Sequence, residues 1–392
     1  MKILMINVSC GSGSTGRICT DIATELDRKG HCVRIAYGRD DVPNQYKKYA
    51  VKIGNDFSVY MHGLRARIFD EMGYGSVKAT KEFIKWIEDF NPDIIHLHNI
   101  HGYYINIKIL FEYLRKANKK VIWTLHDCWC FTGHCAYFDY VQCDKWKSGC
   151  EKCSQRHEYP ARWIFDRSKK NYELKKSLFT NIKDLTFVTP SYWLAGLLKE
   201  SFLSEYPVKV IHNGIDTSVF KPTQSNIKDK LGIKDKKMVL GVASVWDRRK
   251  GLDTFFELAK KIDDSYKIVL VGLNEKQIKN LPASIIGIER TDSVDELVQL
   301  YSAADVFVNP TLEDNYPTTN LEAIACGTPV ITFNTGGSVE SASLYGGCIS
   351  NKCSTSILEE LENIGRYQKD NKTNLSCKDK VKQYFEMYKD IE

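Results

Sequence analysis

The residues with the clearest chemical potential lie in segment 313–323, which reads EDNYPTTNLEA. A strand-like run, DVFVNP, precedes it, and Pro317 suits the first position of a helix. The backbone N–H groups of residues 316–319 would then lie at a helix N-terminus, where they can bind the oxygens of a diphosphate. Glu322 follows Thr318 by about one helical turn and can accept two hydrogen bonds from ribose hydroxyls. The segment therefore indicates a site for a nucleoside diphosphate.

A basic turn, WDRRKG, lies upstream in the same half of the chain. It places Arg248, Arg249 and Lys250 between a strand-like segment and a helix-like segment. Fixed cations at such a turn would balance the charge of a diphosphate leaving group. The alternative is that the two segments are an ordinary basic turn and an ordinary acidic helix start without a ligand. Because both occur at strand ends of one predicted domain, a diphosphate site is favoured.

A glycine-rich turn, CGSGSTGR, follows the first strand-like segment and precedes a helical pattern that starts at about Arg17. Gly13 and Gly16 would let backbone N–H groups approach an anion at a helix N-terminus. The spacing does not complete the dinucleotide-binding fingerprint, because no acidic residue closes the second strand. A tight turn without a ligand is therefore the alternative.

His126 ends the strand-like run VIWTLHD, and the preceding strand-like run ends with His96, His98 and His101. Open α/β sheets bind ligands at the carboxyl ends of their strands. His126 could hydrogen-bond a sugar or a phosphate there, or it could cap buried carbonyl groups.

Short β-branched runs alternate with helix-period segments along the whole chain, which predicts repeated βαβ units and parallel sheets. The runs are KILMINV, CVRIAYG, DIIHLHN, VIWTLHD, LTFVTPS, VKVIHNG, KMVLGVAS, KIVLVG, DVFVNP and TPVITFN. The fold class is α/β, with two doubly wound, Rossmann-like domains. We expect the first domain at 1–205, the second at 206–375, and a C-terminal helix at 376–392 that can cross back to the first domain.

Composition is consistent with two folded domains, since 43% of the 392 residues are apolar and 27% are charged. The apolar runs are far shorter than the roughly 18 residues of a membrane span, and the N-terminus does not resemble a secretory signal. A cytoplasmic protein is expected.

Residues 1–200 carry 31 Lys and Arg against 22 Asp and Glu, a net +9, and the remainder carries −3. The basic half could face nucleic acid, an anionic membrane or a phosphorylated substrate.

An aromatic, cysteine-rich insertion at about 128–158 interrupts the βαβ pattern. Cys135, Cys143, Cys150 and Cys153 have the spacing C-x7-C-x6-C-x2-C, and four thiolates could hold a structural zinc ion in a reducing compartment. Two disulfides or buried free thiols are the alternatives, and Cys128 and Cys130 could compete as ligands.

Several motifs, in order, resemble those of the retaining glycosyltransferases of family 4, which have the GT-B fold. They are IHNGIDTSVFKP, the turn at Lys250, and LEDNYPTTNLEAIACGTPVITFNTGG. HLHNIHGYY, TLHDCWCFTGHCAYF and CDKWKSGC are similar to bacterial enzymes of capsule and exopolysaccharide assembly. The resemblance implies two Rossmann-like domains facing a cleft, with the acceptor on the first and a nucleotide sugar on the second.

The resemblance also implies roles for single residues. Glu322 matches the second glutamate of the family's E-x7-E pair, which binds ribose. Asp314 stands where the first glutamate contacts the donor sugar, with Glu313 beside it. Lys250 matches the diphosphate lysine, whereas the family's upstream arginine has no counterpart, so that Arg249 or Arg248 would substitute. The remaining expected contacts are Asn315, Tyr316, Thr318 and Thr319 to the donor, His126 to the donor sugar, and the loop of Gly13 and Gly16.

The expected activity is that of a retaining hexosyltransferase using a UDP- or GDP-sugar, with no cofactor and no Asp-x-Asp metal motif. The resemblance implies a polyprenyl-diphosphate-linked saccharide acceptor and peripheral attachment to the inner face of the plasma membrane. Arg162 to Phe165 through Lys175 and Lys176 would supply cations and apolar anchors. A sugar-nucleotide epimerase or an inverting GT-B enzyme is the alternative within the fold. A zinc-containing module that binds nucleic acid is the alternative from another class, although its expected basic stripe is missing.

Overall fold

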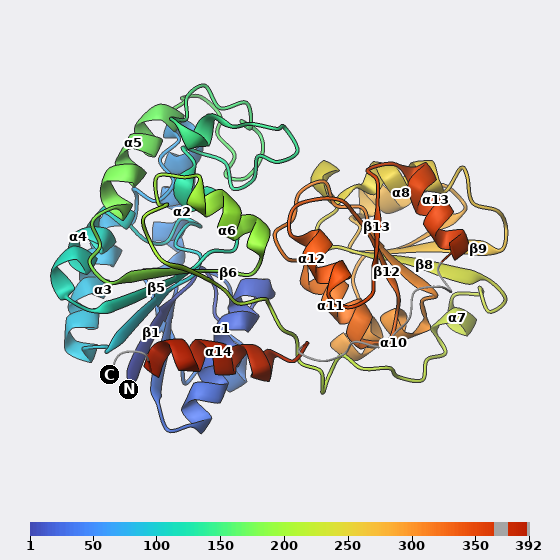
Figure 1. The fold of residues 1–392 in the computed structure, drawn as a ribbon, viewed down its shortest axis with the longest axis horizontal. Coiled ribbons are helices and arrows are strands. Elements are labelled where there is room, and N and C mark those ends of the chain that lie inside the picture. The colour runs from blue at the N-terminus through green and yellow to red at the C-terminus, as the bar shows by residue number, and fades with distance from the viewer. Residues whose placement is uncertain (364–374, 390–392) are drawn as a thin grey trace. The chain divides into compact units, whose positions relative to one another are not determined.

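The computed structural model describes residues 1–363 and 375–389, so that parts of the expected second domain (364–374) and C-terminal helix (390–392) lie outside it. The chain divides into two compact units, one of residues 1–212 together with the C-terminal helix from Lys380, the other of residues 213–379. Each unit is built on its own parallel sheet with helices on both faces (Figure 1). The α/β, doubly wound architecture predicted from the alternating pattern is confirmed.

The first unit contains a seven-stranded parallel sheet in the order β3-β2-β1-β4-β5-β6-β7. Its strands are β1 (Lys2–Ile6), β2 (Cys32–Tyr37), β3 (Ala50–Lys52), β4 (Ile94–Leu97), β5 (Lys120–Thr124), β6 (Leu185–Thr189) and β7 (Val208–Val210). Its helices are α1 (Gly13–Arg28), α2 (Asp56–Phe69), α3 (Val77–Phe90), α4 (Ile107–Ala117), α5 (Ser168–Phe179), α6 (Tyr192–Lys199) and α14 (Cys377–Lys389).

Alternate residues of the central strands enter two separate cores, as the pleat requires. Leu4 and Ile6 of β1 pack in the core that α3 and α4 cover, whereas Ile3 and Met5 pack with α1 and α14. The two helices α1 and α14 therefore lie on the same face of the sheet (Figure 1). The hydroxyl of Tyr388 on α14 lies 2.6 Å from Nδ1 of a β4 histidine, which ties the C-terminal helix to the sheet.

The second unit contains a six-stranded parallel sheet in the order β10-β9-β8-β11-β12-β13. Its strands are β8 (Lys237–Val242), β9 (Tyr266–Val271), β10 (Ile285–Ile288), β11 (Val306–Asn309), β12 (Val330–Phe333) and β13 (Cys348–Ser350). Its helices are α7 (Ile227–Lys230), α8 (Leu252–Leu258), α9 (Glu275–Lys279), α10 (Val294–Ala303), α11 (Thr318–Ala325), α12 (Ser338–Ser343) and α13 (Ser354–Asn363).

Both sheets reverse their strand order once, between β1 and β4 in the first and between β8 and β11 in the second. At such a point the two connections leave the sheet toward opposite faces, which opens a crevice at the carboxyl ends of the strands. The glycine-rich turn follows β1, and the basic turn and segment 313–323 follow β8 and β11. The polar motifs of the sequence therefore lie where this fold binds ligands.

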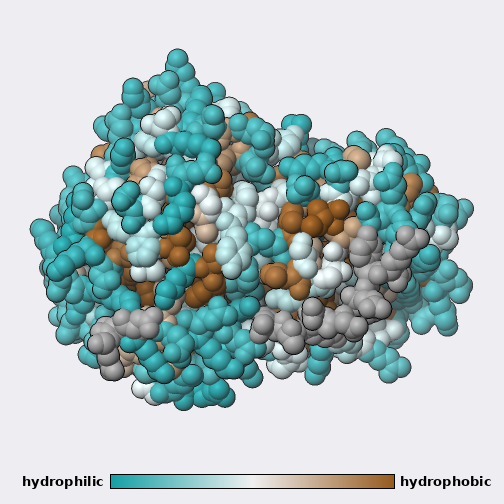
Figure 2. Space-filling view, viewed as in Figure 1, coloured by the Kyte–Doolittle hydropathy of each residue, from teal (hydrophilic) through white to brown (hydrophobic). Residues whose placement is uncertain are grey.

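All ten strand segments predicted from the sequence are strands, and three short edge strands, β3, β10 and β13, were not predicted. The first helix begins at Gly13 rather than at Arg17, because the helix continues through glycine and serine residues that carry no apolar pattern. Hydrophilic residues predominate on the face shown in Figure 2, as expected for units whose apolar residues fill internal cores.

In the insertion after β5, Phe131, Phe138 and Trp146 pack against one another and join the core of the first unit. All thirteen cysteines are free thiols, and the expected zinc site at Cys135, Cys143, Cys150 and Cys153 is not supported. The four thiols line one small cavity of about 20 Å³, but within residues 1–363 and 375–389 no three His, Cys, Asp or Glu side chains are placed to hold a metal ion. Cys135 and Cys153 hydrogen-bond each other instead.

Lys175 on α5 does not lie at the surface, contrary to its expected role as a membrane-facing cation. It is 1% exposed, and its Nζ donates to the carbonyl oxygens of Trp129 (2.6 Å) and Thr132 (3.0 Å) while lying 3.5 Å from the centre of the Trp129 ring. Burial lowers its pKa to about 7. The lysine therefore fixes the insertion to α5.

Replacing Lys175 with alanine should lower the free energy of unfolding by about 2–4 kcal/mol, because two buried carbonyl groups lose their donor. Lys176, the next residue, is exposed, so that Lys176→Ala should change the free energy of unfolding by about 0.5 kcal/mol or less. Urea unfolding of the two variants measures the difference. Equal effects would show that Lys175 does not hold the insertion.

Candidate functional site

The basic turn after β8 is fixed against the loop after β11. Asp247 caps the turn through Oδ1, which accepts a hydrogen bond from the Lys250 amide at 2.9 Å. Gly251 has φ +77°, and a Cβ there would lie 2.1 Å from the carbonyl oxygen of Pro310, so that only glycine allows this approach. The amide of Leu312 donates to the carbonyl oxygen of Arg249 at 2.8 Å. We refer to the two segments 247–251 and 311–322, the second of which includes the start of α11, as the β8/β11 site.

The side chains of the basic turn meet the acidic residues predicted to accompany them. Nζ of Lys250 lies 2.6 Å from Oδ2 of Asp314, with the two side chains 23% and 12% exposed. Nη1 of Arg249 donates to the carbonyl oxygen of Glu313 at 3.0 Å. Arg248 is exposed, whereas Arg249 is half-buried beside segment 313–314, so that the geometry favours Arg249 over Arg248 as a cation of this site.

Helix α11 begins at Thr318 in the middle of the β8/β11 site. Pro317 precedes it at the N-cap position with φ −67°, rather than at the first helical position expected from the sequence. The amide of Asn315 donates to Oδ1 of Asp314 at 2.9 Å, which orients the carboxylate that also binds Lys250. The helix N-terminus adds partial positive charge to that of the two cations, an arrangement that suits a diphosphate.

Glu322 lies one turn into α11 and is 5% exposed. The hydroxyl of Tyr301 on α10 donates to its Oε2 at 3.0 Å. Neighbouring Asn320 is held by the side chains of Asn309, Ser338 and Ser341, which fixes the helix on the sheet. The carboxylate of Glu322 is therefore rigidly held.

The sequence did not predict the roles of Tyr301 and Thr335 near this site. The contact from Tyr301 depends on a tertiary approach that no local pattern encodes. Thr335 follows β12 in the run NTGG, and its hydroxyl is buried without a hydrogen-bond partner among the described residues. Its position after a strand end was the available signal. A ligand oxygen could satisfy this hydroxyl.

The glycine-rich turn after β1 forms a close-packed connection into α1. Gly11 and Gly13 have φ of +81° and +66°. A Cβ on Gly16 would lie 2.7 Å from Oγ of Ser9, whereas the space around Gly13 is open to a distance of 4 Å. Glycine is therefore required for tight packing at position 16 and for backbone conformation at position 13. The open space at Gly13 leaves room for a ligand at the start of α1.

A chain of histidines crosses the carboxyl ends of β4 and β5. Nδ1 of His98 lies 3.1 Å from Nε2 of His126, and the two rings stack with 15° between their planes. His96 contacts the His98 ring, with 4.1 Å between the ring centres, and Nε2 of His96 lies 2.8 Å from Oγ1 of Thr124. The structure therefore brings His126 into a buried network that the sequence did not predict.

A second pair supports the same edge of the sheet. Nε2 of His101 lies 2.9 Å from Oδ2 of Asp127, and Nδ1 of His101 lies 2.9 Å from the hydroxyl of Tyr159. Burial lowers the pKa of His126 to about 4, although the carboxylate of Asp127 opposes this shift. His126 is therefore a neutral imidazole at neutral pH, able to form hydrogen bonds without adding a charge.

The predicted site residues thus fall into two groups. His126, Gly13 and Gly16 belong to the first unit, around the reversal between β1 and β4. The second unit brings together the other ten near the reversal between β8 and β11: Arg248, Arg249, Lys250, Glu313, Asp314, Asn315, Tyr316, Thr318, Thr319 and Glu322.

A nucleotide-binding architecture in each unit is what a GT-B glycosyltransferase requires, and family models agree with it. The model described as Glycosyltransferase Family 4 matches residues 15–219, and the model described as Glycosyl transferases group 1 matches residues 236–362. The first match alone spans more than half of the chain. The chain belongs to glycosyltransferase family 4, and the resemblance seen in its motifs is confirmed.

Two bacterial relatives illustrate the similarity. An Escherichia coli K12 protein with the name of a colanic acid biosynthesis glycosyl transferase, WcaC, is 25% identical over 363 residues, covering 88% of this chain and 86% of that protein. The N,N'-diacetylbacillosaminyl-diphospho-undecaprenol alpha-1,3-N-acetylgalactosaminyltransferase of Campylobacter jejuni is 28% identical over 160 residues, covering 38% of this chain and 42% of that enzyme.

Solved structures confirm the GT-B fold. Sucrose-phosphate synthase from Thermosynechococcus elongatus superposes with a TM-score of 0.71 at 16% identity, covering 100% of this chain and 98% of the other. Anabaena Alr3699/HepE in complex with UDP superposes with a TM-score of 0.70 at 15% identity, covering all of both chains. Among the described residues, no helix combines the length and the apolar character needed to cross a membrane.

The buried histidines predict how stability depends on pH. Burial lowers the pKa of His62 to about 4 and that of His96 to about 3, and it lowers the pKa of His98 well below its usual value. In the unfolded chain these groups titrate near pH 6.5, so that between about pH 6.5 and pH 4 the unfolded chain binds more protons. The free energy of unfolding should therefore fall with falling pH, by about 1.4 kcal/mol per histidine per pH unit.

Urea unfolding followed by circular dichroism at pH 7 and pH 5 measures this fall. His157 is exposed, so that His157→Asn should leave the pH dependence in place. A free energy of unfolding that stays constant between the two pH values would contradict the buried, neutral histidines.

Proposed function

We propose that this glycosyltransferase transfers a hexose with retention of configuration from a UDP- or GDP-sugar to a saccharide linked to polyprenyl diphosphate. The observation that supports this most is the β8/β11 site, where two cations and the α11 N-terminus converge beside a carboxylate. The HepE structures in complex with UDP and with UDP-glucose support a uridine donor. The Campylobacter enzyme supports an undecaprenol-linked acceptor.

In this proposal the diphosphate lies between the basic turn and the first amides of α11, including those of Thr318 and Thr319. Lys250 and Arg249 balance its charge, and Glu322 binds the ribose hydroxyls. The ion pair with Lys250 orients the Asp314 carboxylate for the sugar. Glu313, Asn315 and Tyr316 complete the donor loop.

The transfer proceeds on one face of the sugar. The bond between the anomeric carbon and the leaving phosphate oxygen breaks, and the acceptor oxygen forms a bond to the same face of that carbon. The acceptor proton passes to the leaving phosphate oxygen. Arg249, Lys250 and the helix amides stabilise the charge that develops on the diphosphate. Neutral His126 forms a hydrogen bond to a sugar hydroxyl, with His98 fixing its orientation.

The proposed role is assembly of a capsule or exopolysaccharide repeat unit at the cytoplasmic face of the membrane. The relationship to WcaC, a protein named for colanic acid biosynthesis, supports this role. A lipid-linked acceptor resides in the bilayer, so that the enzyme would work while peripherally attached to it.

Glu322→Ala should weaken binding of UDP or GDP by about 1.5–3 kcal/mol, because ribose hydroxyls lose a charged acceptor. Glu275, exposed on α9 of the same unit, supplies the matched control, since Glu275→Ala should leave nucleotide affinity unchanged. Calorimetric titration with both nucleotides makes the comparison. If Glu322→Ala binds as tightly as the unaltered protein, the ribose contact is wrong.

Lys250→Ala should reduce the rate of nucleoside diphosphate release from the preferred nucleotide sugar about 100-fold, because the leaving-group charge is greatest in the transition state. Lys260→Ala, at an exposed position of the same unit, is the control and should retain the full rate. A panel of UDP- and GDP-sugars identifies the donor. Equal rates in the two variants would remove Lys250 from the mechanism.

A further inference from the structure

Helix α2 carries an exposed apolar stripe. Phe57, Met61, Leu64 and Ile68 follow one another at intervals of three or four residues, which places them on one face of the helix, with Tyr60 beside them and Phe69 at the end of the helix. Phe57 and Tyr60 are 72% and 67% exposed. The opposite face is buried through small residues such as Ala66. Amphipathic helices usually turn their apolar stripe toward the core, so that this stripe requires a partner outside the unit.

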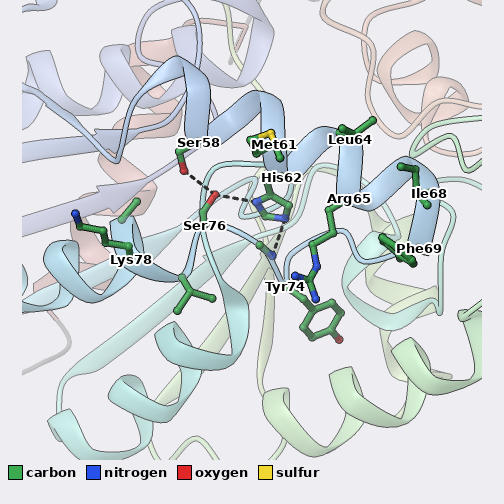
Figure 3. A pocket seen from close by; sticks show the side chains of 13 residues that line it. Ser58, Met61, His62, Leu64, Arg65, Ile68, Phe69, Tyr74, Ser76 and Lys78 are labelled. Carbon is green, nitrogen blue, oxygen red and sulfur yellow. Dashed lines mark hydrogen bonds between the residues drawn. The ribbon is translucent and has the colours of Figure 1, made fainter.

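The stripe forms one wall of a groove with a volume of about 510 Å³, and the start of α3 forms the other wall (Figure 3). Met61, Leu64 and Ile68 line the α2 side, and Val77 and Ala79 line the α3 side. The lining is therefore mainly apolar, as a site for hydrocarbon requires.

The floor of the groove is rigid. Nδ1 of His62 lies 2.9 Å from Oγ of Ser76, and its Nε2 accepts hydrogen bonds from the amides of Gly73 and Gly75, both at 3.1 Å (Figure 3). The same histidine ring packs edge-on against Tyr103, in the loop that follows β4. The groove is therefore separated from the loop after β4, which also carries His98 and His101, only by the contact between the His62 and Tyr103 rings.

A second exposed apolar segment extends the stripe. Trp163, Ile164 and Phe165 are 51%, 62% and 52% exposed. The Phe165 ring stacks on Phe69 with 5.7 Å between the ring centres, and the Phe165 amide donates to the carbonyl oxygen of Ile68 at 3.2 Å. The two apolar segments therefore form one continuous surface, which we call the α2 face (residues 57–69 and 163–165).

Cations surround the α2 face. The guanidinium of Arg67 lies 5.8 Å from the centre of the Trp163 ring, and the exposed Arg156, Lys169 and Lys170 flank residues 163–165 in the chain. Three of the nearby acidic residues are compensated. Asp70 is buried against His134, Glu71 is buried against Arg65 and Arg167, and Asp166 pairs with Arg162. The exposed carboxylates of Glu158 and Glu173 lie in the same stretch but are outnumbered by the four exposed cations, so that the outward charge of this surface is positive.

We propose that the α2 face binds an anionic lipid bilayer and that its groove receives one hydrocarbon chain of a membrane lipid. Aromatic and aliphatic side chains beside exposed cations are the combination that binds the boundary between headgroups and acyl chains. A second copy of the chain fits less well, because symmetric pairing would bring these cations against their own counterparts. The inference rests on the proposed lipid-linked acceptor and specifies which surface brings the first unit to it.

Trp163 provides a direct test. The structure describes all seven tryptophans, and Trp163 is the only one of them that is exposed to solvent. Vesicles of phosphatidylglycerol and phosphatidylethanolamine with brominated acyl chains should quench part of the protein's tryptophan emission. Trp163→Phe should abolish this quenching while the protein still sediments with the vesicles. Unbrominated vesicles supply the baseline.

Met61→Asp should weaken vesicle binding at least tenfold, because it places a carboxylate in the groove wall. The matched control is Val294→Asp, since Val294 on α10 is 47% exposed and Met61 is 45% exposed. Lys169→Glu with Lys170→Glu should also weaken binding, about fivefold for each cation lost, and binding should fall with rising salt. The control should bind like the unaltered protein.

Three outcomes would overturn the inference: no binding to anionic vesicles at low salt, equal binding by Met61→Asp and Val294→Asp, or dimers in solution that Met61→Asp dissociates. The vesicle measurements contain no nucleotide sugar. Their failure would therefore leave the transferase proposal intact, and failure of the donor experiments would leave the lipid surface intact.

Discussion

The constraint on which the rest of the structure depends is the parallel pairing of every strand in both sheets. Parallel strands need crossover connections, which bring all carboxyl ends to one edge of the sheet. One reversal of strand order in each sheet then separates two neighbouring connections. The motifs that follow β8 and β11 lie far apart in sequence, yet this topology brings Lys250 within 2.6 Å of Asp314.

The two units meet different electrostatic requirements. The β8/β11 site gathers fixed cations and helix amides, which suit a charged diphosphate. The edge of the first sheet gathers His96, His98 and His126, whose low pKa values keep the imidazoles neutral. Neutral imidazoles at the first edge can form hydrogen bonds without adding charge.

The sequence was sufficient for the architecture and for the polar turns, because buried parallel strands are apolar throughout and the turns follow them directly. It missed the contacts of Tyr301 with Glu322 and of His98 with His126, which depend on packing between distant elements. Edge strands such as β13, with three residues, are too short for a pattern. The expectation of a zinc site is not supported, because cysteine spacing does not determine where the thiols point. In the same way, the position of Lys175 in the sequence does not determine whether its side chain is buried or exposed.

The central claim is that the nucleotide sugar binds at the β8/β11 site. Hydrogen–deuterium exchange of the intact protein, with and without a saturating UDP- or GDP-sugar, tests it most directly. We expect amides of 247–251 and 311–322 to exchange more slowly with the donor bound, while those of α9 and α13 stay unchanged. If the donor binds but neither segment is protected from exchange, binding at the β8/β11 site is contradicted.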